Sequence, residues 1–274
     1  MMERHNPPRR LGPPPRSETP RPGAPHAAPR GGMWLYGLHA VAAALANPHR
    51  RARRLLLTDE AEAALGPRMG GPWPLAPERT ERGRLDQLLG HNTVHQGAAL
   101  LADPLAQPPL AQVLARPGPL IVLDQVSDPR NVGAILRSAA AFGAAGVIAQ
   151  ERNAPDETGA LAKAASGALE TIPLLRAVNI ARTLIALKAA NCWTVGLAAE
   201  APGALSGPVL RARRVALVLG AEDEGLRRLT RETCDEIARL AMPRAGGKAM
   251  PSLNVAAAGA IALYELSRPG DAPA

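Results

Sequence analysis

The feature that most constrains the fold is a regular alternation of short apolar runs and helical segments from Pro119 onward. The apolar runs are too short for helices and are apolar along their length, so both of their faces should be buried. We expect strands at 120–123, 147–149, 172–175, 193–197, 215–219 and 236–242, and helices at 132–142, 158–168, 180–190 and 253–266. This alternation predicts an α/β fold with a parallel sheet that helices cover on both faces.

The remainder of the chain divides into tails, a small unit and a linker. Residues 1–32 are rich in Pro and Arg and poor in large apolar side chains, so we expect a disordered tail. Residues 33–102 predict a small α/β unit, with strands near 55–58 and 97–101 and a helix over 79–89. Four prolines within 103–118 indicate an interdomain linker. The main domain then spans 119–268, and 269–274 form a second disordered tail.

The charge of the chain favours a polyanionic partner without proving one. Lys and Arg total 32 against 24 Asp and Glu, a net charge of +8. Residues 1–32 hold six Arg and two Glu and contribute +4, which leaves +4 for the rest. A basic balance is typical of nucleic-acid-binding proteins. Arg-rich proteins that bind no anion have it too, so charge alone leaves RNA binding an even choice.

The two cysteines, Cys192 and Cys234, are far apart and form no CxxC motif. They therefore predict neither a metal site nor a disulfide framework, and a reducing cytoplasm is the simplest location. No apolar run reaches the roughly 18 residues that a membrane-spanning helix needs. The N-terminus lacks the apolar segment of a secretory signal. We expect a cytoplasmic protein without a membrane contact.

Three of the predicted strand ends carry polar residues and glycines. The first loop is D-Q-V-S-D-P-R-N-V-G at 124–133, the second is L-G-A-E-D-E-G at 219–225, and the third is M-P-R-A-G-G-K-A-M-P-S-L-N-V at 242–255. Ligands of open parallel sheets bind outside the carboxyl ends of the strands. The three loops are therefore the candidates for a shared site.

Each loop also has an ordinary explanation when taken alone. The first can be a plain strand-to-helix turn, with Arg137 on the helix surface six residues after Asn131. The second can be a solvated acidic loop or a Mg²⁺ site. In the third, Ser252 can simply cap the last helix. What argues against three separate explanations is their order, N-x-G-x-x-x-R, then G-x-E-x-x-G, then S-L-N-V before a C-terminal helix.

In this order the three loops resemble motifs 1, 2 and 3 of the SpoU/TrmH family of SPOUT methyltransferases. The stretch LAKAASGALETIPLLRAVNIARTL resembles the middle segment of that family. In the small unit, YGLHAV and VHQG resemble the ribosomal-protein-like RNA-binding domain of family members that methylate a guanosine of 23S rRNA. The resemblance covers roughly Tyr36 to Leu266.

The resemblance implies a fold, a reaction and a set of site residues. It implies a deep trefoil knot in the parallel-sheet domain and a homodimer whose active site takes residues from both subunits. It implies methyl transfer from S-adenosylmethionine to a ribose 2′-hydroxyl of RNA, most simply 23S rRNA, without a metal. The polar site would comprise Asn131, Arg137, Glu222, Ser252 and Asn254. The cofactor would bind near Gly220, Leu240 and Leu253.

The role of Arg137 and the length of the third loop need separate comment. The family assigns the arginine as a base, but a guanidinium has a pKa above about 12 and scarcely loses its proton. We therefore expect Arg137 to hold an RNA phosphate and orient the ribose. The loop that ends in Ser-Leu-Asn is several residues longer here than in the family, which makes Leu240 a less direct match than Gly220 or Leu253. Arg244 and Lys248 in the extension are either RNA contacts or solvated charges.

Other functions remain open at this point. A tRNA 2′-O-methyltransferase of the same family and a non-catalytic RNA-binding protein on the same fold both fit the sequence. A dinucleotide-dependent oxidoreductase is disfavoured, because no G-x-G-x-x-G follows the first core strand. We expect His39 and His95 to be structural. The basic run Arg50, Arg51, Arg53 and Arg54 is either a phosphate contact or a solvated corner.

Overall fold

The computed structural model describes residues 32–268 except 153, 211, 223 and 243–252. The first part of this range forms a small unit around a four-stranded sheet in the order β1-β4-β2-β3. Strand β4 pairs antiparallel with both β1 and β2, and β2 pairs parallel with β3. The elements of this N-terminal unit are β1 (Met33–Tyr36), α1 (Leu38–Ala46), β2 (Ala52–Leu57), α2 (Asp59–Met69), β3 (Pro77–Arg79), α3 (Arg82–Leu89) and β4 (Ala98–Ala102).

The second part forms a seven-stranded sheet in the order β7-β6-β5-β10-β8-β11-β9. Every pairing between its strands is parallel, which confirms the predicted sheet. The strands are β5 (Leu120–Asp124), β6 (Gly146–Gln150), β7 (Leu174–Ala177), β8 (Cys192–Leu197), β9 (Gly203–Ala204), β10 (Arg214–Gly220) and β11 (Glu236–Arg239). The helices are α4 (Leu110–Leu114), α5 (Pro129–Ala141), α6 (Gly159–Ala165), a 3-10 turn (Ala168–Glu170), α7 (Ile180–Ala189), α8 (Gly207–Leu210), α9 (Arg228–Thr233) and α10 (Val255–Ser267).

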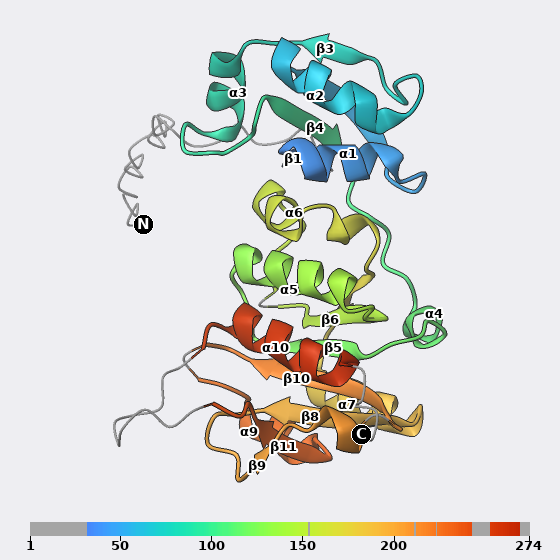
Figure 1. Ribbon diagram of the computed structural model, residues 1–274, viewed down its shortest axis with the longest axis vertical. Coiled ribbons are helices and arrows are strands. Elements are labelled where there is room, and N and C mark those ends of the chain that lie inside the picture. Colours follow the sequence, from blue (N-terminus) through green and yellow to red (C-terminus); the bar gives the residue numbers. More distant parts are fainter. Residues whose placement is uncertain (1–31, 153, 211, 223, 243–252, 269–274) are drawn as a thin grey trace, which may run out of the picture.

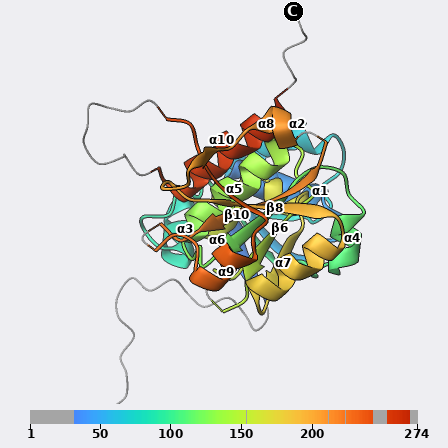
Figure 2. The ribbon, with the colours of Figure 1, turned by 90° about the horizontal axis from the view of Figure 1, so that it is seen from below.

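Side chains that alternate along the central strands bury the two faces of this sheet. Ile121 and Leu123 of β5 pack in one apolar cluster with α5, α6 and α10. Leu120 and Val122 of the same strand pack in another cluster with α4 and α7. In Figure 2, α10 and α7 accordingly lie on opposite sides of β8 and β10. The expectation of helices on both faces is confirmed.

Helix α6 lies between α5 and the N-terminal unit (Figure 1). Two glycines allow the close approach on that side, since a Cβ at Gly159 would lie 2.4 Å from the carbonyl oxygen of Trp34, and one at Gly167 would lie 2.9 Å from Ala43 Cβ. Apolar residues of both units, such as Leu35 and Leu161, belong to one continuous cluster. The N-terminal unit is therefore packed directly on the larger sheet domain.

The basic run at the start of β2 is paired within the protein. Arg50 is buried and binds Glu170 and Glu157, while Arg51 and Arg53 pair with Asp103. Arg54 pairs with Glu78 on β3. Arg50 is therefore neither a phosphate contact nor part of a solvated corner, the two interpretations that the sequence left open, because its charge is compensated inside the molecule.

His95 is buried, and its ring nitrogens contact Asp86 Oδ1 at 3.0 Å and the backbone N–H of Gly97 at 3.1 Å. His95 therefore has the structural role expected of it. His39 is exposed at the start of α1.

Several boundaries differ from the predictions for local reasons. Helix α5 begins at Pro129, because Asp128 accepts a hydrogen bond from the N–H of Arg130 and caps it. The expected helix over 79–89 begins only at Arg82, since residues 77–79 pair with β2. Strand β11 ends at Arg239 rather than at 242.

Within the described ranges, no helix is both long and apolar enough to cross a membrane. The same part of the chain contains no cluster of three or more His, Cys, Asp or Glu that could hold a metal ion.

Candidate active site

The first and second loops begin side by side at the carboxyl edge of the sheet. Strands β5 and β10 are neighbours, and Asp124 and Gly220 are paired in their register. Each strand ends there, and the chain turns out of the sheet into its loop. Parallel pairing thus places residues that are 96 positions apart at the same edge.

The second loop folds back on itself immediately after Gly220. Ala221 and Gly225 exchange two backbone hydrogen bonds of 3.1 and 2.9 Å. Gly225 has a φ of 66°, a left-handed conformation that favours glycine. A Cβ at Gly220 would lie 2.2 Å from the backbone carbon of Gly225, so this close turn requires a glycine. The tight turn presents Glu222 at its tip.

Asp124 secures the far end of the same loop. Its carboxylate is completely buried and accepts hydrogen bonds from the backbone N–H of Arg227 at 3.1 Å and from Arg227 Nε at 2.7 Å. Arg227 Nη2 lies 2.6 Å from the same carboxylate. Asp124 therefore contacts the loop at both ends, next to Gly220 and at Arg227. Sequence reasoning missed this pair, although an acid ending an otherwise apolar strand was a usable signal.

The third loop contributes Asn254, which caps helix α10. Asn254 Oδ1 accepts hydrogen bonds from the N–H groups of Ala256 at 2.9 Å and Ala257 at 3.3 Å. This is the usual function of an asparagine at a helix N-terminus. The cap orients the amide nitrogen of Asn254 away from the helix and toward the other two loops.

One residue from each loop meets in a hydrogen-bonded triangle. Glu222 Oε1 accepts from Asn131 Nδ2 at 2.8 Å and from Asn254 Nδ2 at 2.6 Å. Asn254 Nδ2 also donates to Asn131 Oδ1 at 3.0 Å. Asn131 is at the first turn of α5, where the cap at Asp128 fixes the helix start. Three of the five predicted polar residues are thus in direct contact.

A cavity of about 370 Å³ lies beside this triangle. The three residues predicted to bind a cofactor, Gly220, Leu240 and Leu253, all line it, as does Glu222. Its volume is within the usual range for small-molecule sites. The third-loop extension therefore does not displace Leu240 from the cavity.

The chemistry of the cavity wall suits S-adenosylmethionine. Leucine and valine side chains offer apolar faces to a purine ring, and the backbone at three strand ends offers hydrogen-bonding groups. Among the described residues that line the cavity, three are acids (Glu200, Glu222 and Glu224) and one is a cation (Arg231). This balance favours a ligand with a positively charged sulfur. Arg231 hydrogen-bonds Glu200 at the rim and lowers the pKa of that carboxyl group.

The other two predicted polar residues are Arg137 and Ser252. Arg137 is exposed on α5, and its side chain makes no hydrogen bond or ion pair with the described residues. Ser252 lies outside the described residues, as do Arg244 and Lys248.

Comparison with known proteins places the chain in a family context. A family model described as the SpoU rRNA Methylase family matches residues 118–264. The chain is 38% identical over 246 residues to the 23S rRNA (guanosine-2′-O-)-methyltransferase RlmB of Vibrio vulnificus, and the match covers 86% of this chain and 96% of that relative. It is 42% identical over 192 residues to RlmB of Nitrosomonas europaea, with 69% and 72% of the two chains covered.

Solved structures share the fold. The SpoU methyltransferase AviRb from Streptomyces viridochromogenes superposes with a TM-score of 0.71 at 20% identity, and 87% of this chain and 89% of AviRb are covered. AviRb in complex with the cofactor AdoMet gives a TM-score of 0.69 at 23% identity, with 87% and 90% covered. An rRNA methyltransferase from Sinorhizobium meliloti gives 0.67 at 25% identity, with 87% of each chain covered.

Proposed function

The chain belongs to the SpoU rRNA methylase family, and from this we propose that it transfers a methyl group from S-adenosylmethionine to the 2′-hydroxyl of a guanosine in 23S rRNA. The relatives that match most of its length carry the name of that activity. The observation that carries the proposal is the triangle of Asn131, Glu222 and Asn254 at the rim of the cavity that Gly220 and Leu253 line.

In this reaction the protein must align the ribose hydroxyl with the methyl donor and allow one proton to leave. S-adenosylmethionine supplies, when bound, a methyl group on a positively charged sulfur that leaves as a neutral thioether. The ribose oxygen would accept that methyl group and release its proton to solvent, so the protein's own residues have to align the hydroxyl for this step. Alignment of the reacting atoms is a large part of such catalysis.

Glu222 is well placed to orient the incoming ribose. Its Oε1 is held by two amides, whereas its Oε2 accepts no hydrogen bond from any described residue. The free oxygen can accept a hydrogen bond from the ribose, while the triangle fixes the position of the carboxylate. Asn131 and Asn254 act as positioning residues for Glu222.

Arg137 fits a site shared between two subunits. It is exposed and lies on the same helix as Asn131, six residues further along. We propose that in a homodimer Arg137 reaches the site of the partner subunit and holds an RNA phosphate there. Ser252, which precedes Leu253 directly in the chain, completes the polar site in this proposal.

Three further features complete the proposal. The C-terminal segment passes through a trefoil knot, as in the family that the sequence resembles. The N-terminal unit, residues 33–102, binds the RNA substrate, and residues 103–118 link it to the catalytic domain at 119–268. The protein acts in the cytoplasm, where ribosomal RNA is available.

Methylation of RNA fragments tests the proposal. Purified protein, labelled S-adenosylmethionine and transcripts of 23S rRNA and tRNA should give labelled 23S rRNA alone, with 2′-O-methylation mapped to one guanosine. Glu222→Gln should reduce the rate by about 10²-fold or more. Labelled tRNA would favour the alternative substrate. Protein that binds RNA but gives no heat of S-adenosylmethionine binding in calorimetry would instead be a non-catalytic member of the fold.

A further inference from the structure

Helix α6 connects the candidate active site to the N-terminal unit. On one side it packs on α5 at Gly133, where a Cβ would lie 2.5 Å from the carbonyl oxygen of Leu161. Gly133 is two residues after Asn131 of the triangle. On its other side α6 contacts β1 and α1 of the N-terminal unit. Helix α6 therefore lies between the two parts to which the proposed function assigns RNA binding and methyl transfer.

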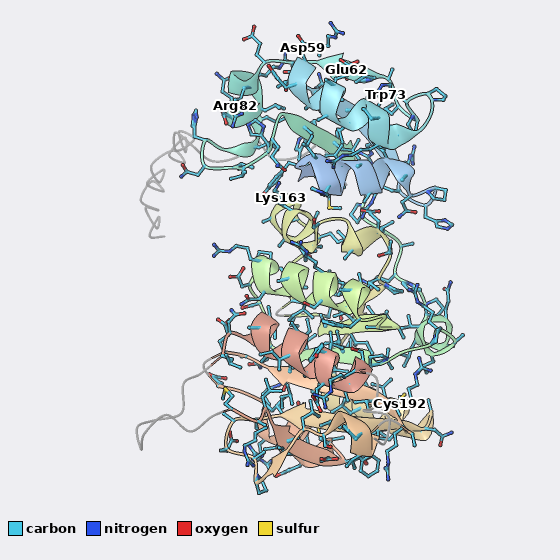
Figure 3. The ribbon with its side chains drawn as sticks, in the orientation of Figure 1. Asp59, Glu62, Trp73, Arg82, Lys163 and Cys192 are labelled. Carbon is cyan, nitrogen blue, oxygen red and sulfur yellow. The ribbon has the colours of Figure 1, made fainter. Side chains whose placement is uncertain are left out.

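One lysine lies where α6 meets the N-terminal unit. Lys163 Nζ hydrogen-bonds Gln96 Oε1, and its side chain lies against Gly37. Figure 3 shows Lys163 on the side of α6 that faces the N-terminal unit. We refer to Lys163, Gln96 and Gly37 as the seam.

No acid in the described part of the chain balances the charge of Lys163. Among the described residues, no carboxylate lies within ion-pair distance of it. The other lysine that the structure describes, Lys188, pairs with Asp235 at 2.8 Å. Burial lowers the pKa of the Lys163 ammonium, because part of its hydration is lost without a carboxylate to replace it. An anion that arrives at the seam would restore that balance.

Gln96 has an unusual backbone conformation for its type. Its φ is 54°, in the left-handed region, and Gly97 follows with a φ of 76°. A left-handed residue other than glycine, asparagine or aspartate is uncommon, and such strain persists where the structure uses it. The conformation directs the exposed Gln96 amide toward both Lys163 and the backbone N–H of Leu38, 3.4 Å away. Gln96 therefore has an amide N–H group to offer beside the Lys163 ammonium.

We propose that the seam binds a phosphate of the RNA substrate, with Lys163 and Gln96 as its donors, and so guides the strand from the N-terminal unit to the triangle. This inference rests on the proposed function and adds a contact to it. An ammonium next to a neutral amide suits a phosphate oxygen, to which both donate. The contact is to the backbone, so it contributes affinity and register without reading the base sequence.

Salt-dependent binding of a 23S rRNA fragment tests the seam. Lys163→Gln should weaken binding about three- to tenfold at low salt and reduce the slope of log K against log salt by about one. Lys163→Arg keeps the charge and should restore most of the slope. Lys188→Gln removes a lysine that is paired with Asp235 and should leave the slope unchanged. S-adenosylmethionine affinity should be equal in all four proteins.

Gln96→Gly separates RNA binding from stability. Glycine relieves the left-handed strain, so its melting temperature should equal or exceed that of the wild type, yet its RNA affinity should fall. Suppose that the wild type methylates the fragment, and that Lys163→Gln and Gln96→Gly both keep its RNA affinity and its salt slope. That result would overturn the proposed phosphate contact at the seam and leave the proposed function standing. A wild type that neither binds nor methylates rRNA would overturn the proposed function and the seam with it.

Discussion

Arg50 Nη2 and Glu170 Oε1 are 2.7 Å apart, although 120 residues separate them in the chain. Their side chains are 0% and 4% exposed, and Arg50 Nε donates to the second oxygen of the same carboxylate at 3.1 Å. This two-point ion pair joins the corner before β2 to the 3-10 turn that follows α6. It fixes how the N-terminal unit sits on the sheet domain, in addition to the apolar packing around it.

Loss of this pair should destabilise the whole protein. Glu170→Gln removes one of the two acids that face the buried Arg50 guanidinium. Breaking a buried ion pair typically lowers the free energy of unfolding by about 3 to 5 kcal/mol. The matched control is Glu78→Gln, whose partner Arg54 is exposed, and for such pairs the cost is about 1 kcal/mol or less. Urea unfolding measures both. Equal losses in the two variants would show that Arg50 and Glu170 do not join the units.

Asn254→Asp should separate helix capping from catalysis. Aspartate caps a helix as well as asparagine does, so α10 should keep its start. The same change places a carboxylate oxygen where Asn254 Nδ2 now lies 2.6 Å from Glu222, and the repulsion should displace Glu222. Methyl transfer should fall about 10²-fold, as expected for a misplaced catalytic group.

The control for this variant is Asn179→Asp. Asn179 caps α7 by accepting a hydrogen bond from Arg182 N–H, and no triangle residue contacts it. It should retain both the melting temperature and the rate of the wild type. If Asn254→Asp also kept the full rate, the triangle would have no part in the reaction.

Gly220→Ala should distort the cofactor cavity. The new Cβ would lie 2.2 Å from a backbone carbon of Gly225, so the turn that carries Glu222 would have to open. S-adenosylmethionine affinity should fall by about tenfold or more, which corresponds to about 1.4 kcal/mol. Gly203→Ala is the control, because a Cβ there has no neighbour within 4 Å. Calorimetric titration with S-adenosylmethionine measures the affinity of both variants. An unchanged affinity in Gly220→Ala would exclude Gly220 from the binding site.

The two thiols should react slowly in the folded protein. Burial raises the pKa of Cys192 and raises the pKa of Cys234 to about 12, against about 8.5 for a free thiol. The raised folded pKa favours the neutral thiol, so its contribution to stability is complete below about pH 8.5 and is lost as pH rises toward 12. Alkylation by iodoacetamide near pH 8.5 should be much slower than in urea, and equal rates would contradict the burial of both groups.

The parallel sheet could be predicted because its strands are short, apolar and regularly separated by helices. Such runs have few ways to bury both faces, so strands at 120–123 and 215–219 were placed within one residue of their observed ends. Boundaries that depend on a cap or a pairing were less certain. Strand β9, of two residues, pairs only through its contact with β11, and no local pattern indicates it.

The sequence indicated candidate residues for the site but not the contacts between them. The spacing of the loops, together with their resemblance to a family, pointed to Asn131, Glu222 and Asn254. That Glu222 receives both amides on one oxygen depends on the capping of α5 and α10 and on the turn at Gly220. The pair of Asp124 and Arg227 was missed, because a buried acid and a partner 103 residues away show no periodic signal.

The sequence by itself determined the alternation of the main strands and helices from Pro119 onward and the positions of the three loops, since hydrophobic pattern and spacing are local properties. Tertiary structure decided which charges are compensated and which are available. Arg50 and Lys163 look alike as basic residues in a sequence, yet one is enclosed by Glu157 and Glu170 while the other meets a neutral amide at an interface. The free energy of a charge depends on burial and on the distance to its partners, and both quantities exist only once the chain has folded.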